Sequence, residues 1–246
     1  MSQNLLDLLA PRSAPDRIFG VVSGIVTNNQ DPDKLGRVKV RFPWLSASDE
    51  SWWARVAAPM AGKGRGAYFL PEVDDEVLVA FEHGDPSRPY VVGFLWNGTD
   101  APPKKNSEAV ANGKVNLRVL KTRAGHTITL DDTEGAEKIE IVDKTENNKI
   151  TIESSSNTIS VIADADVKIT ATGNVKVEAT GDATVDAQNA TVTAKQNGKL
   201  SAAQLELEGT ASVKISGPQV TVEANGTLDL KSAGIANLKG SLVNIN

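Results

Sequence analysis

The sequence predicts an all-β protein made of a small closed barrel and a long shaft of intertwined chains. Three observations support this prediction. Every Phe, Tyr and Trp lies between Phe19 and Trp96. The chain from there to Asn246 alternates Val, Ile, Leu and Ala with polar residues, and from about residue 165 it repeats every eight residues. Because large rings supply much of the buried apolar area in ordinary cores, a stretch without rings must close its apolar surface by repetition or by pairing with other chains.

Composition excludes several classes of function. The 246-residue chain has a net charge of -5 and no basic block, which argues against nucleic acid as a partner. It has no cysteine, which excludes disulfides, thiolate metal sites and a cysteine nucleophile. It has only two histidines, His83 and His126, so a histidine-based metal or acid–base site is not expected. Residues 1–16, the predicted N-terminal arm, do not resemble a signal peptide, and no segment approaches the ~18–20 apolar residues of a membrane span. We therefore expect a chain that is made in the cytoplasm.

Residues 17–96 are predicted to form five short strands separated by turn residues. Asn28, Asn29 and the Asp31-Pro32-Asp33 run mark the first loop. Five strands in about 80 residues favour a closed barrel of the OB type, since closure removes exposed strand edges. The predicted strands are 18–27, 37–42, 52–57, 77–81 and 91–95.

Three features of this head could suggest chemistry, and each has a simpler interpretation. The glycine-rich residues 62–66 lack phosphate-loop spacing and precede no helix pattern, so we expect a mobile barrel loop. The carboxylates at 74–76 fit a solvated turn before a strand. His83 fits a turn residue with local hydrogen bonds, because no second histidine or hydroxyl partner accompanies it.

The motifs of the head also carry a family resemblance. They are RIFGVV at 17–22, DPDKLGRVKV at 31–40, WWARV at 52–56, GAYFLPE at 66–72 and EHGDPSRP at 82–89, followed by LRVLKTRAGHTITLDDT at 117–133. Together they closely resemble the OB domain, and its transition into a shaft, of contractile-injection spike proteins. This family comprises the VgrG proteins of type VI secretion and the phage baseplate assembly protein V, with counterparts in extracellular contractile injection systems.

The tail begins after a polar linker predicted at 97–112. Residues 113–162 are predicted to be a transition region of short strands at 115–119, 128–130, 139–141, 150–152 and 159–161. Residues 163–246 then repeat an apolar-x-apolar strand and a polar turn, with an irregular stretch near 190–204. One unit buries too little surface to offset its ordering entropy, so the units must stack. A single-chain β-solenoid and an intertwined multi-chain prism both satisfy that need.

Strand length favours the multi-chain alternative. Eight residues span only about 25 Å, which is too short to wind once around a filled core, whereas three chains each supplying one face close the cross-section. This argument and the family resemblance together predict a trimeric, triple-stranded β-helix, or β-prism. Its trimer core is predicted to contain Val167, Ile169, Val175, Val177, Val185, Leu205, Leu207, Val213, Ile215, Val220, Val222, Leu228, Leu230 and Leu238.

The resemblance implies a mechanical function: the central spike of a phage tail-like machine, a homotrimer that punctures the target envelope. It implies a separate hub protein at the barrel end, since only about sixteen residues precede the barrel, and effector cargo as a further partner. The linker leaves no room for a peptidoglycan-cleaving domain. We expect no enzymatic activity, cofactor or metal, and contact with a membrane only on injection. The alternative is an adhesive or glycan-binding fibre with a β-helical shaft.

Two further predictions concern individual residues of the tail. The uncharged end at 240–246 lacks the histidines of a metal-binding tip, so the resemblance implies a PAAR-type tip protein docked on Leu242, Val243 and Ile245. His126 precedes Asp131 and Asp132, and we expect it to make a structural hydrogen bond. The Asp residues of the repeat lack calcium-repeat spacing, so a solvated outer face is expected.

Overall fold

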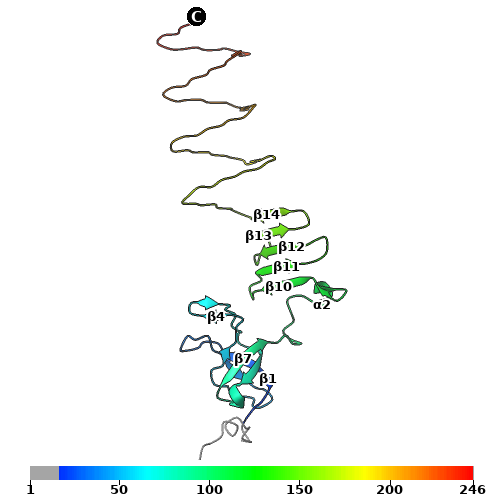
Figure 1. The fold of residues 1–246 in the computed structure, drawn as a ribbon. Helices are drawn as coiled ribbons and strands as arrows, with labels where there is room; N and C mark the ends of the chain where they lie inside the picture. Colours follow the sequence, from blue (N-terminus) through cyan, green and yellow to red (C-terminus); the bar gives the residue numbers. More distant parts are fainter. Residues whose placement is uncertain (1–16, 246) are drawn as a thin grey trace, which may run out of the picture. The chain divides into compact units, whose positions relative to one another are not determined.

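The computed structural model describes residues 17–245 and divides into two units, Met1–Thr172 and Gly173–Asn246 (Figure 1). The predicted N-terminal arm at 1–16 lies outside the described residues. Short strands dominate residues 17–172, the described part of the first unit, which contains one α-helical turn and one 3₁₀ turn. The predicted all-β class is therefore confirmed for the head and for the strands that follow it.

The head is a five-stranded sheet that closes on itself, as predicted. Its strand order is β2-β1-β6-β7-β3, antiparallel except for the parallel pair β3 and β7. Two backbone hydrogen bonds between Val38 and Ala54, of 3.0 and 2.7 Å, join the outer strands and complete the barrel. The strands are β1 (Val21–Asn28), β2 (Lys39–Arg41), β3 (Arg55–Val56), β6 (Glu76–Phe81) and β7 (Pro89–Phe94).

Valine fills the interior of this barrel. Along β6 every second side chain points inward, so that Val77, Val79 and Phe81 are buried while their neighbours are half-buried. The Phe81 ring packs at 5.7 Å from the Phe42 ring. Gly24 lies beneath these residues, and a Cβ there would collide with Val40 and come within 3.0 Å of the Phe42 ring. The core therefore depends on the missing side chain at this position.

Residues 62–66, expected to be a mobile loop, are instead part of a hairpin. It consists of β4 (Ala61–Gly62) and β5 (Arg65–Gly66), paired in antiparallel register. Gly64 adopts φ +65° and Gly66 φ +154°, and at Gly66 a Cβ would meet the Met60 carbonyl oxygen at 2.6 Å. The glycines are needed for the backbone conformation of this tight hairpin, so their presence does not indicate a phosphate-binding loop.

The segment predicted as a linker contains some structure. Helix α2 (Asn106–Ala109) precedes a small hairpin of β8 (Val110–Ala111) and β9 (Lys114–Val115). An antiparallel meander follows, with each strand paired to the next, where strands were predicted. It comprises β10 (Leu117–Lys121), β11 (Thr127–Asp131), β12 (Lys138–Val142), β13 (Lys149–Glu153) and β14 (Thr158–Ile162).

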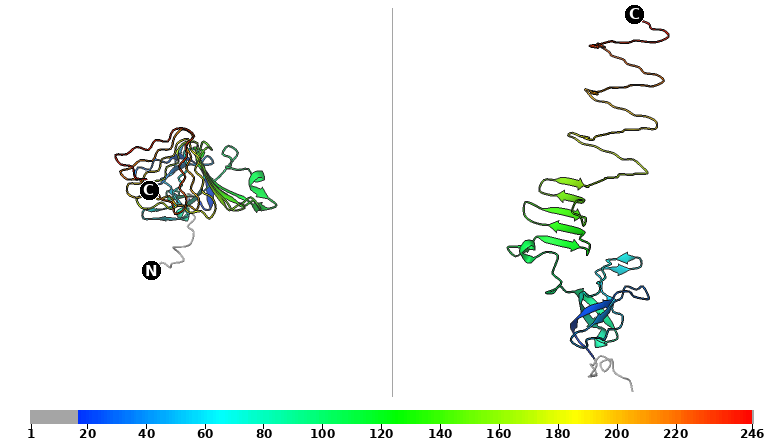
Figure 2. Two further views of the ribbon diagram at one scale, coloured as in Figure 1. Left: turned by 90° about the horizontal axis from the view of Figure 1, so that it is seen from above. Right: turned by 180° about the vertical axis from the view of Figure 1, so that it is seen from behind.

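No strand pairing exists in the described residues after Ile162. The second unit is an extended chain that turns at regular intervals and winds as an open spiral (Figure 2). The bends after Ile162 lie at 164–165, 172–173, 180–181, 188, 195–196, 203–204, 210–211, 218, 225–226, 233–234 and 241. The described single chain therefore does not form the paired sheet of the predicted shaft, which stays a prediction.

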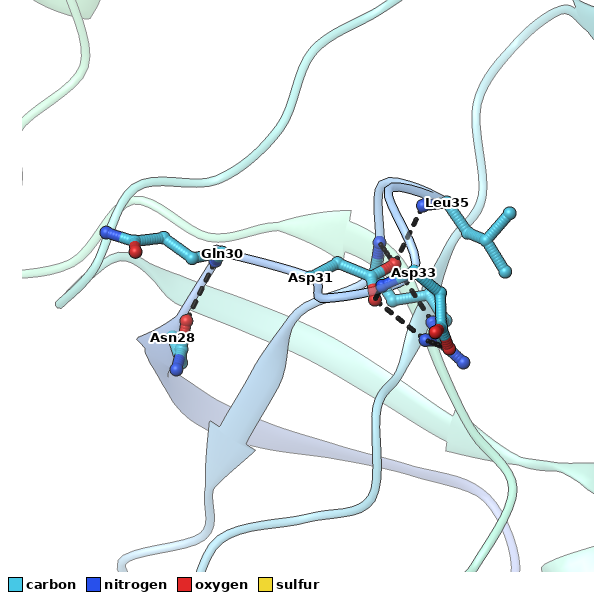
Figure 3. A network of polar contacts seen from close by, with 6 residues as sticks. Asn28, Gln30, Asp31, Asp33 and Leu35 are labelled. Carbon is cyan, nitrogen blue, oxygen red and sulfur yellow. Dashed lines mark hydrogen bonds and ion pairs between the residues drawn. The ribbon is translucent and has the colours of Figure 1, made fainter.

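The Asp31 carboxylate organises the loop between β1 and β2 (Figure 3). It accepts hydrogen bonds from the backbone N–H groups of Asp33, Leu35 and Arg37 at 2.9–3.2 Å. The Arg37 guanidinium adds two more, at 2.7 and 3.0 Å, and also lies over the Trp53 ring. These contacts, the Arg37 hydrogen bonds foremost, hold the pKa of Asp31 well below its usual range although burial opposes the shift. Five donors on one carboxylate make this loop rigid.

The Gly24→Ala substitution is expected to destabilise the head by about 1–3 kcal/mol, because the added methyl overpacks the barrel against Val40 and Phe42. The measurement is chemical unfolding followed by tryptophan fluorescence, which reports on the head alone because every Trp lies there. Gly93→Ala is the matched control, since a Cβ at Gly93 would meet only Leu78 at 4.0 Å. Equal stability of the two variants would contradict this account of the core.

The Asp31→Asn variant is expected to melt at a lower temperature than the parent at neutral pH. A carboxyl with a lowered folded-state pKa contributes stability above its unfolded pKa, about 3.9, and loses it as pH falls through the folded-state value. The gap between parent and variant should therefore narrow below about pH 4. Thermal unfolding from pH 7 to pH 3 tests this, with Asp33→Asn, a mostly exposed neighbour, as control. A gap that does not change with pH would refute the role of the Asp31 charge.

Candidate functional site

The meander sheet has an uncovered apolar face. Cross-strand register aligns its large aliphatic side chains in two columns on one face. Their exposed fractions lie between 40% and 70%, although residues of this kind normally fill a core. The first column contains Leu120, Ile128, Ile141, Ile150 and Val161, and the second contains Leu130, Ile139, Ile152 and Ile159.

The opposite face of this sheet is polar and better covered. Thr151, in the central part of β13, is only 6% exposed. Lys138 and Glu140 form an ion pair there at 3.2 Å. Pro103 and Lys104, from the segment before α2, line a groove together with side chains of this face. The chain thus covers part of the polar side of its own sheet, and in the described residues it leaves the apolar side to solvent.

The turns of the meander are held by local polar contacts. Asp143, at the end of β12, accepts hydrogen bonds from the side chains of Asn148 at 3.0 Å and Thr145 at 2.7 and 2.9 Å. These contacts, Asn148 first, lower the pKa of Asp143 to about 2. His126 accepts a hydrogen bond on Nδ1 from the Lys144 backbone N–H at 3.2 Å, the structural contact expected of it. Asp143 therefore stabilises the turn between β12 and β13, and His126 links that turn to the turn before β11.

The predicted core residues of the shaft are exposed in the single chain. Their exposed fractions range from 51% for Leu228 to 85% for Leu230. The described tail residues after Asp164 make no backbone hydrogen bonds to other segments. Such a segment leaves both its apolar side chains and its peptide groups without partners, so its conformation depends on something outside the chain.

The bends show that the repeat continues through residues 190–204, where the sequence appeared irregular. Bends follow each other after seven or eight residues along the whole tail. The middle position of each stretch between bends carries a large aliphatic residue. Val192 and Leu200 occupy that position in the stretch concerned, and a fixed period of eight missed both.

A small residue two positions after each of these aliphatic residues was the signal that could have found them. This position is always Ala, Gly or Ser and lies just before a bend. Its members are Ala171, Ala179, Ala187, Ala194, Ala202, Gly209, Gly217, Ala224, Ser232 and Gly240.

The predicted tip residues also lie on the exposed part of the chain. Leu242 is 76% exposed, Val243 45% and Ile245 85%. They follow the last bend, at residue 241, and none is paired with another segment among the described residues. Their predicted role in docking a tip protein therefore stays a prediction.

The head shows no convergence of reactive groups. Within residues 17–245 no cluster of His, Asp and Glu side chains suits a metal ion. His83 lies in the 3₁₀ turn η1 (Glu82–Gly84), where its backbone carbonyl accepts a 2.7 Å hydrogen bond from Arg17. Among the carboxylates at 74–76, Glu76 accepts a 2.8 Å hydrogen bond from Asn97, and Asp75 accepts one of 2.7 Å from the Glu72 N–H. No helix in the described part of the chain is long and apolar enough to cross a membrane.

Comparison with known proteins identifies the head. Residues 22–96 match the family model of the type VI secretion system/phage-baseplate injector OB domain. The chain is 33% identical over 111 residues to the type VI secretion system spike protein VgrG3 of Vibrio cholerae, covering 44% of this chain and 11% of that protein. It is 32% identical over 139 residues to the spike protein VgrG1a of Pseudomonas aeruginosa, covering 52% of this chain and 21% of that protein.

A further relative is the actin cross-linking toxin VgrG1 of Vibrio cholerae, which is 31% identical over 111 residues, covering 44% of this chain and 10% of that protein. The chain thus spans about a tenth to a fifth of the length of the curated relatives it matches. The matched family model covers the closed barrel from the second residue of β1 to the end of β7. The chain therefore carries the injector OB domain of the type VI secretion and phage-baseplate family and is related to the VgrG spike proteins.

Proposed function

We propose that this chain is the central spike of a contractile injection machine and that it acts as a homotrimer. The observation that carries the proposal is the tail, whose aliphatic side chains and peptide groups have no partner within one chain. The apolar face of the meander, which precedes the tail in the chain, likewise lacks a covering partner among the described residues. Copies of the same sequence are the natural partners, because their bends and aliphatic positions share one spacing.

Three copies satisfy the geometry of the repeat. A stretch of seven or eight residues between bends spans about 25 Å, which suits one face of a prism. With three chains, each face of the cross-section is supplied by a different chain, and no strand edge remains free along the shaft. The middle aliphatic residues then point toward the axis, and the small residues before each bend lie at the corners.

The mechanism of such a spike is mechanical. A closed prism in which every peptide donor and acceptor is bonded resists bending and buckling, because deformation has to break many hydrogen bonds together. Contraction of a surrounding sheath supplies the work, and the shaft transmits it to the target envelope. No reacting group of the chain is needed, so we expect the spike itself to have no enzymatic activity.

The same function assigns partners to the two ends. A separate hub protein is expected at the barrel end and a PAAR-type tip protein at the C-terminus, with effector cargo carried by the assembled machine. The spike protein is then a component of a secretion or phage tail-like apparatus, and it meets a membrane only on injection. The names of the related spike proteins support the role of a component of a secretion apparatus.

The Val222→Asp variant is expected to lose the trimer. Val222 occupies a middle position of the repeat, and in the prism three carboxylates would meet near one axis without partners. Burial of an unpaired ion costs several kcal/mol even after relaxation. Light scattering gives the mass, which should be that of a trimer for the parent and smaller for the variant.

The neighbouring substitution Thr221→Asp is the matched control, since successive side chains of a strand point to opposite faces. It should assemble and melt as the parent does. A Val222→Asp variant that behaves like this control would exclude the prism or its register, and a parent with monomer mass would exclude the trimer.

Deletion of residues 240–246 is expected to abolish binding of the tip protein while the trimer remains. Three copies of Leu242, Val243 and Ile245 would form a small platform with free strand edges, and the lack of charge there does nothing to discourage further pairing. Pull-down with the tip protein, together with light scattering of the truncated chain, measures both properties. A truncated trimer that binds the tip protein with unchanged affinity would move the docking site elsewhere.

A further inference from the structure

The head has an apolar surface with a basic border on the side of the β4–β5 hairpin. Its four apolar members are 55–78% exposed, and they line one hollow together with Arg65. Lys63 lies at the tip of the hairpin. Neither Lys63 nor Arg65 forms an ion pair within the described chain. We call this the basic surface; it consists of Leu35, Met60, Tyr68, Phe69, Lys63 and Arg65.

A second apolar surface, bordered by acids, lies where β7 ends and β6 begins. Phe94 is 49% exposed, Trp96 71% and Val73 46%. The pairing of Phe94 with Val77, continued by the Leu95 N–H bond to the Glu76 carbonyl, brings these segments together. Asp74 follows Val73 in the chain, and the Asn97 N–H donates to the Asp100 carbonyl at 3.0 Å, which holds Asp100 close to the residue after Trp96; both Asp residues are exposed. We call this the acidic surface; it consists of Val73, Asp74, Phe94, Trp96 and Asp100.

Both surfaces are held in place before any partner arrives. The Asp31 network fixes the loop that presents Leu35 on the basic surface. Asn97 fixes the residues around Trp96: its side chain donates to Glu76 at 2.8 Å and accepts from the Asp100 backbone N–H at 2.7 Å. Surfaces that need no ordering lose little entropy on docking, which favours their use as interfaces.

The two surfaces complement each other and not themselves. Each combines exposed aromatic rings with unpaired charge, but the charges have opposite signs, so like surfaces repel and unlike surfaces attract. Contact between two different surfaces of identical chains is heterologous, and it forms a closed ring when the rotation between copies completes a circle. In Figure 1 the β4–β5 hairpin and the end of β7 lie on different sides of the barrel, so the two surfaces do not overlap.

We propose that the basic surface of each head docks on the acidic surface of the next copy, so that three heads form a closed ring. This inference rests on the proposed trimer. The rings of Tyr68 and Phe69 would bury against those of Phe94 and Trp96, with Lys63 and Arg65 facing Asp74 and Asp100. The ring gives the heads a contact of their own, independent of the prism.

Cross-linking of the full chain tests the ring. Because the sequence has no native cysteine, only the introduced cysteines can react with the cross-linker. Ala58 lines the hollow of the basic surface and Val73 lies on the acidic one. A chain with both Ala58→Cys and Val73→Cys, treated with a short bismaleimide, should give covalent trimers on a denaturing gel. Each single-cysteine variant should give none, and neither should Ala58→Cys combined with Ala47→Cys, which lies outside both surfaces.

Charge reversal adds a second arm to the experiment. Lys63→Glu with Arg65→Glu, in the double-cysteine chain, should lower the yield of covalent trimer by about threefold or more, since like charges then face each other. Asp74→Lys with Asp100→Lys should restore it. Conservative Lys63→Arg should leave the yield unchanged.

The outcomes separate this inference from the proposed function. Trimer mass in light scattering with no covalent trimer would overturn the ring and leave the spike intact, and the two surfaces would then serve a different protein. Covalent dimers from a single-cysteine variant would show like-to-like contact and also overturn the ring. A monomer mass for the parent chain in light scattering would contradict both the proposed trimeric spike and the ring of heads.

Discussion

Each peptide N–H and C=O removed from water needs a partner, and the parts of this chain meet that requirement in different ways. The barrel meets it within itself, because the bonds between Val38 and Ala54 close the sheet. The meander meets it between neighbouring strands but leaves its two apolar columns open. The described tail has neither strand pairing nor a buried apolar face within one chain. From the barrel to the tail, the described chain therefore satisfies fewer of its own backbone and apolar groups, and in the proposed trimer the other copies supply the missing partners.

Much of this organisation could be predicted from the sequence, because it depends on local patterns. Alternation with period two located β10 to β14, and turn residues separated the strands of the barrel. The β4–β5 hairpin was missed because Ala61, Gly62, Arg65 and Gly66 have little strand propensity, and the conformation comes from glycine geometry. Val192 and Leu200 were missed because a period fixed at eight loses register when stretches of seven intervene. The docking surfaces of the head require three-dimensional proximity, which no local pattern contains.

The two halves also differ in how polar groups are used. In the head, charged and polar side chains support the fold: Asp31 accepts from three backbone donors and Arg37, and the Asn97 amide donates to Glu76. In the tail, Lys176 pairs with Glu178 at 2.6 Å and Lys231 with Asp229 at 3.1 Å, all on exposed positions. Exposed pairs of this kind add little stability. Their value in the proposed shaft is to keep the outer faces soluble while the other side chains turn inward.

The uneven spacing of the bends has a consequence for the order of folding. Hairpin-connected strands close short loops and form quickly, so the meander should fold before three tails find each other. A tail with a perfectly regular period could then pair one stretch out of alignment at little cost, since every stretch would look alike. Mixed intervals of seven and eight remove that degeneracy, because a chain slipped by one stretch would have several bends one residue out of alignment, and a one-residue shift turns strand side chains to the opposite face. In the proposed trimer, the uneven spacing therefore fixes the register of the three chains, so that chains aligned at the first bend are also aligned at the last.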